Sequence, residues 1–238
     1  QKSADEFVPL SRGSDGSIVT QFTMTTLEEL GLLKMDFLGL RTLTVIKNAV
    51  DFVEKSTGEF IDVDSIDYDD KEVLASIGTG KTDGVFQLES AGMKNFMKEL
   101  KPQNLEDVIA GISLYRPGPM DFIPKYIKGK DNHEAIQYPC PELEPILSPT
   151  YGCIVYQEQV MQICRRLAGY SYAKADLVRR AMSKKKEDVM LAERDSFIEG
   201  CTARGVMRAD AEDIFDQMVS FAKYAFNKSH ATAYAIIS

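Results

Sequence analysis

QEQVMQICRRLAGYSYAKADLVRRAM, residues 157–182, carries the clearest structural signal in this chain. The pattern predicts one helix over about 157–168 and a second over about 173–182. In the second helix, an amphipathic interpretation directs Leu177 and Met182 toward the core and the arginines toward solvent. The residues that follow predict three more helices, at about 185–204, 208–224 and 229–238. We therefore expect the C-terminal part of the chain to be almost entirely helical.

Upstream of this stretch the pattern is mixed. Three short segments resemble strands, at 17–22, 32–38 and 85–88. Four segments predict helices, at about 41–55, 71–77, 92–100 and 105–115, and a Pro-rich loop is expected at 138–150. No alternation of strands and helices indicates a parallel sheet. The predicted fold class is mainly α with a small β portion, that is, α+β.

The composition is that of a globular protein of one large domain or two small ones, with 238 residues and 44% hydrophobic content. No apolar run approaches the roughly 18 residues of a membrane span, so no membrane partner is expected. The four cysteines lack CxxC spacing, which argues against zinc and favours reduced thiols in a cytoplasmic protein. The chain begins without Met and stops inside an apolar helical run, which suggests a piece of a longer protein.

The distribution of charge is more informative than its sum. The chain carries −8 overall, yet residues 165–186 hold eight basic residues and one acid, a net +7 that leaves −15 for the rest. Such segregation is typical of a surface that binds a polyanion on an otherwise acidic protein. A solvated lysine-rich helix face is the alternative that charge alone leaves open.

Lys34 and Asp36 lie two residues apart in a predicted strand, so both are expected on one face. A carboxylate suits Mg²⁺, and a lysine beside it can neutralise phosphate. From the spacing alone, a plain exposed salt bridge is the favoured interpretation. Asp62 and Asp64 form a DxD pair that could join Asp36 in a two-metal site. A solvated acidic connector is the simpler interpretation of these acids.

Arg179 and Arg180 are candidates for phosphate binding, because the planar guanidinium can grip two oxygens at once. Adjacent helical residues diverge by about 100°, so we expect these two side chains to make different contacts. Further along, Ser229 is a plausible N-cap for the last helix. His230 follows it without a nucleophile and a third group, which argues against a catalytic triad.

Taken together, these segments resemble the alpha subunit of bacterial DNA polymerase III, a C-family polymerase. The resemblance rests on six segments that occur in the family's order: LKMDFLGLRTLT (33–44), GVFQLES (84–90), RPGP (116–119), YGCIVYQEQVM (151–161), RRAM (179–182) with the lysines after it, and FNKSH (226–230). Any one of them is a weak signal, and six in order are a strong one.

The resemblance implies a helical fingers domain attached to the last strand of a nucleotidyltransferase-type palm. Residues 1–41 would be the C-terminal part of the palm, and 42–238 a fingers domain truncated at its C-terminus. The implied site residues are Asp36 as a catalytic carboxylate and metal ligand; Lys34, Arg179, Arg180, Asn227, Lys228, Ser229 and His230 at the nucleotide; and Lys184, Lys185 and Lys186 at DNA. The family pattern leaves four positions as pocket or template-side residues without assigned roles: Gln87, Arg116, Tyr156 and Gln157.

The implied reaction is attack of a primer 3′-hydroxyl on a deoxynucleoside triphosphate (dNTP), with two Mg²⁺ ions in the full-length enzyme. The implied partners are primer–template DNA, dNTPs and, through regions outside this sequence, the sliding clamp and other holoenzyme subunits. The family's paired acids lie in a Pro-Asp-x-Asp-x-Asp motif that nothing before Asp36 matches. We therefore expect the isolated fragment to be inactive. A non-enzymatic nucleic-acid-binding module is the alternative.

Overall fold

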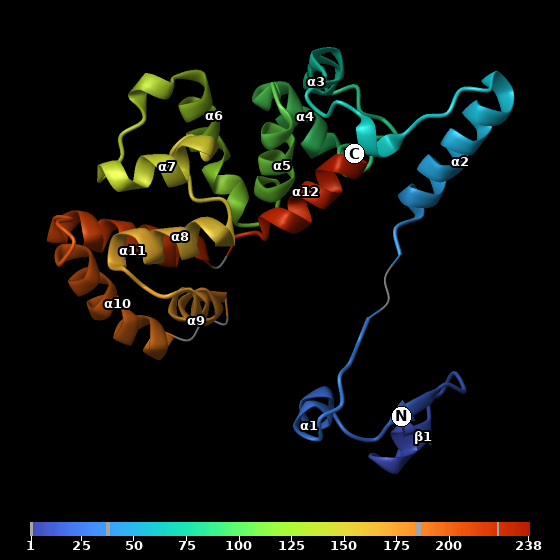
Figure 1. Cartoon of the computed structure of the whole chain (residues 1–238), viewed down its shortest axis with the longest axis horizontal. Coiled ribbons are helices and arrows are strands. Elements are labelled where there is room, and N and C mark those ends of the chain that lie inside the picture. Colours follow the sequence, from blue (N-terminus) through green and yellow to red (C-terminus); the bar gives the residue numbers. More distant parts are fainter. Residues whose placement is uncertain (1, 37–38, 184–186, 223) are drawn as a thin grey trace. The chain divides into compact units, whose positions relative to one another are not determined.

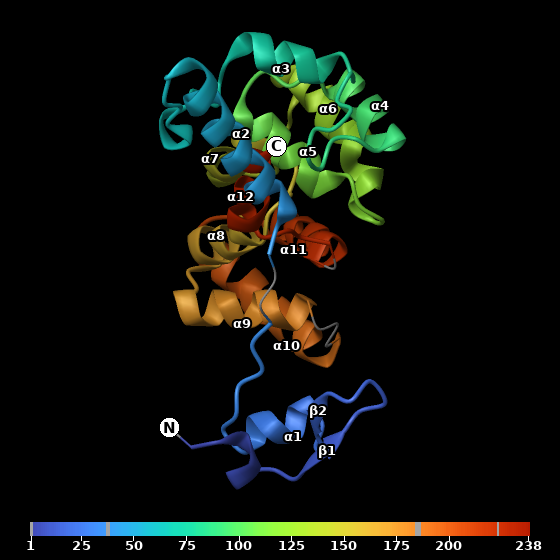
Figure 2. The same ribbon diagram turned by 90° about the vertical axis from the view of Figure 1, so that its right-hand side faces the viewer.

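The computed structural model of the chain describes residues 2–36, 39–183, 187–222 and 224–238 (Figures 1 and 2). The chain forms two compact units, Gln1–Phe52 and Val53–Ser238. The predicted fold class is confirmed, because the described residues are mainly helical with one small antiparallel sheet.

The first unit contains a hairpin and short helices, and α2 continues from it into the second unit. Its elements are the 3-10 helix Ala4–Glu6, β1 (Leu10–Arg12), β2 (Ile18–Thr20), α1 (Met24–Glu29) and the first part of α2 (Arg41–Thr57). The elements of the second unit are the end of α2, α3 (Lys71–Gly78), α4 (Ala91–Leu100), α5 (Leu105–Leu114), α6 (Ile123–Asp131), α7 (Glu144–Leu147), α8 (Gln157–Ala168), α9 (Tyr172–Ser183), α10 (Glu187–Thr202), α11 (Arg208–Ala222), α12 (Lys228–Ile237) and the 3-10 helices Val63–Ser65, Pro119–Phe122, His133–Ala135, Pro141–Leu143 and Ser148–Thr150.

One of the three strand predictions is confirmed. β2 lies within the predicted segment 17–22 and pairs antiparallel with β1, with Ser11 opposite Val19. Asp15 closes the hairpin by accepting hydrogen bonds from the backbone and hydroxyl of Ser17, at 3.0 and 2.6 Å. A short polar side chain that bonds to the backbone two residues later is a typical turn-forming device.

The other two strand predictions are wrong. Residues 32–36 are irregular, because no described segment pairs with them, and residues 37–38 lie outside the described part. Residues 85–88 form turns in which Val85 N–H donates to Thr82 O at 3.2 Å and Leu88 N–H to Val85 O at 3.0 Å. Local hydrogen bonds there replace the ladder that a strand would need.

The second unit has two hydrophobic clusters. One is built mainly by α7–α11, which lie together in Figure 1, and its fully buried residues include Ile163, Phe197 and Met218. The other is built by α3–α6 and α12 around α5, in which every residue from Asp107 to Leu114 is buried. Residue Phe122 packs against both clusters. Phe122 therefore links the two clusters.

Polar side chains fix where several of these helices begin. Asp70, Ser90 and Asn104 each accept a hydrogen bond from a backbone N–H in the first turn of α3, α4 and α5. Such N-caps satisfy donors that the helix itself leaves without partners. The predicted helices agree with the observed ones to within about two residues at most ends, as expected where local signals define a boundary.

Two local predictions need correction. The Pro-rich segment 138–150 is mostly helical, because three of its four prolines, Pro141, Pro145 and Pro149, stand in the first turns of Pro141–Leu143, α7 and Ser148–Thr150, where no backbone N–H is needed. Leu177 is 65% exposed instead of turned inward, because Ala175, Val178 and Ala181 form the buried stripe of α9. The side chain of Met182 lies outside the described part.

The four cysteines are free, as the sequence suggested, and the structure buries all of them. Burial raises the pKa of each thiol, to about 12 for Cys164 and Cys201, so these groups stay protonated near neutral pH. Among the described residues, no helix is long and apolar enough to span a membrane.

A buried ion pair joins α6 to the start of α5. Lys130 Nζ donates to Asp107 Oδ2 at 2.6 Å and to the carbonyl oxygens of Leu100 and Lys101, both at 2.8 Å. The hydroxyl of Tyr151 donates to the other oxygen of Asp107 at 3.1 Å. Because the side chains of Lys130 and Asp107 are only 5% and 1% exposed, each charge depends on its partner.

Replacing Lys130 with Met should lower the free energy of unfolding by about 3–5 kcal/mol, since the carboxylate of Asp107 would stay buried without its cation. Urea denaturation of the chain measures this. Lys128→Met is the matched control, because Lys128 is exposed on the same helix, and it should change stability by no more than about 0.5 kcal/mol. Equal effects of the two substitutions would contradict the assignment.

Candidate functional site

Two segments distant in sequence meet where the two hydrophobic clusters join. Tyr156 and Phe226 form an isolated parallel β-bridge. Phe226 N–H donates to Val155 O at 3.2 Å, and Gln157 N–H donates to Phe226 O at 2.9 Å. This bridge fixes the start of α8 beside the segment that leads into α12, and so brings together most of the residues singled out from the sequence.

Gln157 links the bridge to α9. Its side-chain amide donates to Ala225 O at 3.1 Å and accepts a hydrogen bond from Arg179 at 3.1 Å. Arg179 also donates to Asp176 Oδ1, at 2.9 Å from Nε and 2.7 Å from a terminal nitrogen. These hydrogen bonds, with the charges of Arg179 and Arg180, hold the pKa of Asp176 below its ordinary value.

The expectation that Arg179 and Arg180 make different contacts is confirmed only in part, because Arg179 bonds to Gln157 but both arginines also reach Asp176. Arg180 Nε lies 2.7 Å from Asp176 Oδ2, so both arginines reach the same carboxylate through different oxygens. The reason is that Asp176 precedes them by three and four residues, and both spacings place side chains together on a helix. Arg180 keeps 64% of its side chain exposed, whereas Arg179 keeps 26%.

Glu158 organises the start of α12. Its carboxylate accepts hydrogen bonds from Asn227 Nδ2 at 2.9 Å and from the backbone N–H of Lys228 at 3.1 Å. Asn227 Oδ1 accepts from His230 N–H at 2.8 Å, which makes Asn227 the N-cap. The prediction that Ser229 caps this helix is therefore wrong, because the helix begins at Lys228 and Ser229 already lies in its first turn.

Lys228 reaches back to the first turn of α5. Its Nζ lies 2.9 Å from the carboxylate of Glu106 and 5.4 Å from the ring centroid of Tyr156. Ser229 and His230 are exposed next to it. The segment Asn227–His230 thus presents a lysine, a hydroxyl and an imidazole at one helix start.

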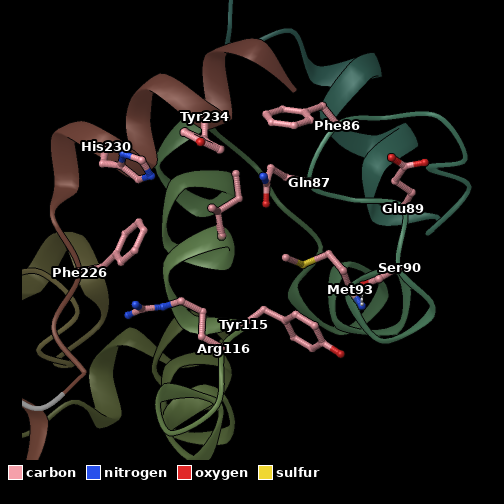
Figure 3. Close-up of a pocket in the computed structure, with 11 residues that line it drawn as sticks. Phe86, Gln87, Glu89, Ser90, Met93, Tyr115, Arg116, Phe226, His230 and Tyr234 are labelled. Atoms are coloured by element: carbon pink, nitrogen blue, oxygen red, sulfur yellow. Dashed lines mark hydrogen bonds between the residues drawn. The ribbon is translucent and has the colours of Figure 1, made fainter. Parts of the chain in front are cut away.

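A pocket of about 580 Å³ lies between the loop 86–90, α4, the end of α5 and α12 (Figure 3). Three of its rings follow one another from the segment before α12 into the helix: Phe226, then His230 and Tyr234, with centroids 5.4 and 4.4 Å apart. Phe86 extends this row from the opposite side, 5.5 Å from Tyr234. The lining is Phe86, Gln87, Glu89, Ser90, Met93, Ile112, Tyr115, Arg116, Phe226, His230 and Tyr234.

Arg116 supplies positive charge at the edge of this pocket. Its guanidinium stacks on Phe226, 4.2 Å from the ring centroid, and donates to Ser113 O and Tyr224 O. Burial lowers the pKa of Arg116 below its ordinary value. Two residues on, Gly118 has φ +100° and lies against the ring of Tyr224, where any side chain would collide.

Gln87 faces the pocket from a constrained backbone, as Figure 3 shows. Its φ of 65° is unusual for a residue with a side chain. The surrounding turn holds it there, because the hydroxyl of buried Thr82 donates to Leu88 O at 2.6 Å. An uncommon backbone conformation at a pocket is a reason to suspect function, since strain persists where the fold enforces it.

Lys34 and Asp36 belong to the first unit and form an exposed ion pair, with Lys34 Nζ 2.9 Å from Asp36 Oδ1. No group of three His, Cys, Asp or Glu side chains that could hold a metal occurs among the described residues. Asp62 is used as an N-cap instead, accepting from Asp64 N–H at 3.1 Å. Lys184, Lys185 and Lys186 lie outside the described residues.

Sequence reasoning missed two residues that build this site. Gln159 is buried, and its amide bonds to the N–H groups of Val155 and Tyr156 and to Ile146 O and Thr150 Oγ1, so it orders the segment before α8. Glu158 was also missed. The signal available was two amides and an acid, Gln-Glu-Gln, at one helix start, where such side chains can bond to the preceding backbone.

Comparison with known proteins identifies the family. Residues 42–205 match the family described as the bacterial DNA polymerase III alpha subunit finger domain. The chain belongs to the bacterial DNA polymerase III alpha subunit family. Residues 1–39 match a second family of the same subunit, described as the bacterial DNA polymerase III alpha NTPase domain. The family resemblance inferred from the six sequence segments is thereby confirmed.

Individual alpha subunits agree with this assignment. The chain is 49% identical over 232 residues to the DNA polymerase III subunit alpha of Bacillus subtilis (strain 168). It is 47% identical over 233 residues to that of Staphylococcus aureus (strain COL) and 50% identical over 238 residues to that of Thermus aquaticus. Each alignment covers 98% of this chain but only 20–22% of the relative, so the chain spans about a fifth of these subunits.

Replacing Asn227 with Ala should lower the free energy of unfolding by about 0.5–2 kcal/mol, because α12 would lose its N-cap. Ser229→Ala is the matched control and should change stability by less than about 0.5 kcal/mol, since Ser229 is exposed and does not cap the helix. Thermal or urea unfolding followed by circular dichroism compares them. A larger loss for Ser229→Ala would show that the helix begins elsewhere.

Proposed function

We propose that this chain is part of a bacterial replicative DNA-directed DNA polymerase, in which it binds the incoming dNTP and primer–template DNA. Membership in the alpha subunit family supports the reaction class. The observation that supports the role of this part is the Tyr156–Phe226 bridge, which places Gln157 and Arg179 beside the start of α12.

In this proposal, Arg179 and Arg180 bind the triphosphate, together with Lys34 and the segment Asn227–His230. A dNTP carries several negative charges, and arginine forks match phosphate oxygens in pairs. Asp176 holds both arginines and competes with phosphate for them. We infer that the carboxylate positions the two guanidinium groups before the nucleotide arrives, which reduces the ordering cost of binding.

Gln157 is the second part of the nucleotide proposal. The amide of Gln157 joins Arg179 to the backbone at Ala225. A movement of α9 would therefore also displace Phe226 and the start of α12. We assign Gln157 a positioning role, and we assign the aromatic pocket with Gln87, Arg116 and His230 to the nucleobase side of the site. Pockets with aromatic walls and a few polar groups suit planar ligands.

We also propose that residues 1–41 are the C-terminal part of the palm and 42–238 belong to the fingers. In the full-length subunit, Asp36 would supply one carboxylate toward two Mg²⁺ ions, the catalytic cofactors of this proposal. Asp36 alone does not make a metal site, and no candidate metal cluster occurs among the described residues. The remaining ligands must therefore come from other parts of the subunit.

The proposed partners follow from the same assignment. Lys184, Lys185 and Lys186 are proposed to contact the DNA backbone, since clustered lysines bind phosphates without sequence preference. The sliding clamp and other holoenzyme subunits would bind other regions of the full-length protein, in the cytoplasm. Membership in a polymerase subunit family does not favour the alternative, a non-enzymatic nucleic-acid-binding module.

Arg179→Ala in the full-length subunit should lower kcat/KM for dNTP incorporation about 10–100-fold, because a hydrogen bond to a charged group contributes roughly 1.5–3 kcal/mol. Arg180→Ala should have an effect in the same range. Steady-state primer extension at varied dNTP concentration measures both.

The control for the arginine variants is Arg208→Ala. Arg208 is an exposed arginine paired with Glu212 on α11, so it also forms a surface ion pair within one helix. It should retain wild-type kcat/KM. If Arg179→Ala and Arg180→Ala both match this control, the arginines do not bind the triphosphate.

Asp36→Asn in the full-length subunit should reduce incorporation to below about a hundredth of wild type, because an amide is a much weaker Mg²⁺ ligand than a carboxylate. Single-turnover primer extension measures the rate. Asp5→Asn, which changes an exposed acid in the same unit, should leave the rate unchanged. Activity of Asp36→Asn above a hundredth of wild type would exclude a catalytic role.

A further inference from the structure

Helices α8 and α9 pack against each other. At one end Gln157 bonds to Arg179, and at the other Arg165 contacts Tyr172. Tyr172 and Arg179 are seven residues apart, close to two helical turns, so they lie on one stripe of α9. We call this stripe and the α8 residues that meet it the α8–α9 edge.

The end of the α8–α9 edge away from Arg179 carries an exposed aromatic ring, Tyr172, whose orientation is fixed by Arg165. The guanidinium of Arg165 lies 3.4 Å from the ring centroid of Tyr172, which is a stacked arrangement. Tyr172 is nevertheless 66% exposed. The arginine therefore orients the ring while much of the tyrosine stays open to solvent. The ordering cost of a second planar group stacking there is correspondingly reduced.

The charges along this edge favour a polyanion. Arg166 is exposed next to Arg165 and has no ion-pair partner within the described ranges. Arg180 is 64% exposed at the other end. The acid on the stripe, Asp176, is balanced by two arginines. A strand of nucleic acid running along the edge would therefore meet net positive charge and an aromatic platform, the combination typical of single-strand binding.

We propose that the unpaired template strand runs along the α8–α9 edge and stacks a base on Tyr172. The inference rests on the proposed nucleotide site at Arg179. Seven helical residues span about 10 Å, and stacked nucleotides advance about 3.4 Å each, so Tyr172 lies about three nucleotides from Arg179 along this edge. The occupant is single-stranded, because the faces of paired bases are covered by their neighbours in a duplex.

The test measures binding of the full-length subunit to primer–templates whose 5′ template overhang is one nucleotide or about ten nucleotides. Fluorescence anisotropy without dNTP gives the affinities. Wild type should bind the long overhang more tightly. Tyr172→Ala should weaken long-overhang binding about fivefold or more and leave short-overhang binding unchanged, since one base stack contributes at least about 1 kcal/mol.

Two further variants test the chemistry of the contact. Tyr172→Phe keeps the ring and should bind within about twofold of wild type. Arg166→Ala removes one phosphate contact. The slope of log affinity against log salt concentration should therefore become less steep by about 1. Met207→Ala removes an exposed apolar side chain that belongs to neither α8 nor α9 and should have no effect.

Wild-type long-overhang affinity in Tyr172→Ala, or an equal loss on both overhangs, would overturn the proposal. The first result would mean that the ring contacts no template, and the second that the substitution disturbs the fold or the duplex contact. Because these measurements contain no dNTP, they are independent of kcat/KM in Arg179→Ala. Failure of the nucleotide site and failure of the template path are therefore distinguishable.

Discussion

The candidate site depends on the two backbone hydrogen bonds that pair Val155 and Gln157 with Phe226. They lie where the cluster around α8–α11 meets the cluster around α5 and α12. Together with the hydrogen bonds from Glu158 to Asn227 and Lys228, they fix the start of α8 beside the start of α12. Gln159 stabilises the pairing, because its buried amide oxygen accepts hydrogen bonds from the N–H groups of Val155 and Tyr156.

Three acidic side chains around this bridge each bind one or more basic or hydrogen-bond-donor groups. Asp176 holds two arginines, Glu158 holds Asn227 and the backbone of Lys228, and Glu106 holds the side chain of Lys228. Each acid keeps cationic or donor groups oriented without burying them completely. Such a surface can exchange an internal carboxylate for phosphate at modest cost, which is why we regard it as prepared for an anionic ligand.

The aromatic pocket and the α8–α9 edge are both connected to the same bridge. Phe226 stacks with Arg116 in the pocket, and its carbonyl accepts from Gln157, which bonds to Arg179. The nucleotide and template proposals therefore share one structural origin. A displacement of Phe226 would affect both, whereas a change at Tyr172 would affect only the far end of the edge.

The sequence by itself determined most helices and the family, because helical periodicity is local and the six motifs occur in order. It failed where local and long-range forces compete. The strand-like segments 32–36 and 85–88 pair with no strand among the described residues. Asn227, not Ser229, caps α12, because Glu158 holds Asn227 and the backbone of Lys228. Only the tertiary structure decided that Gln87 and His230 share a pocket, that Gln157 meets Arg179, and that Arg165 stacks on Tyr172. Those contacts join separate elements, and their geometry depends on how the two clusters pack.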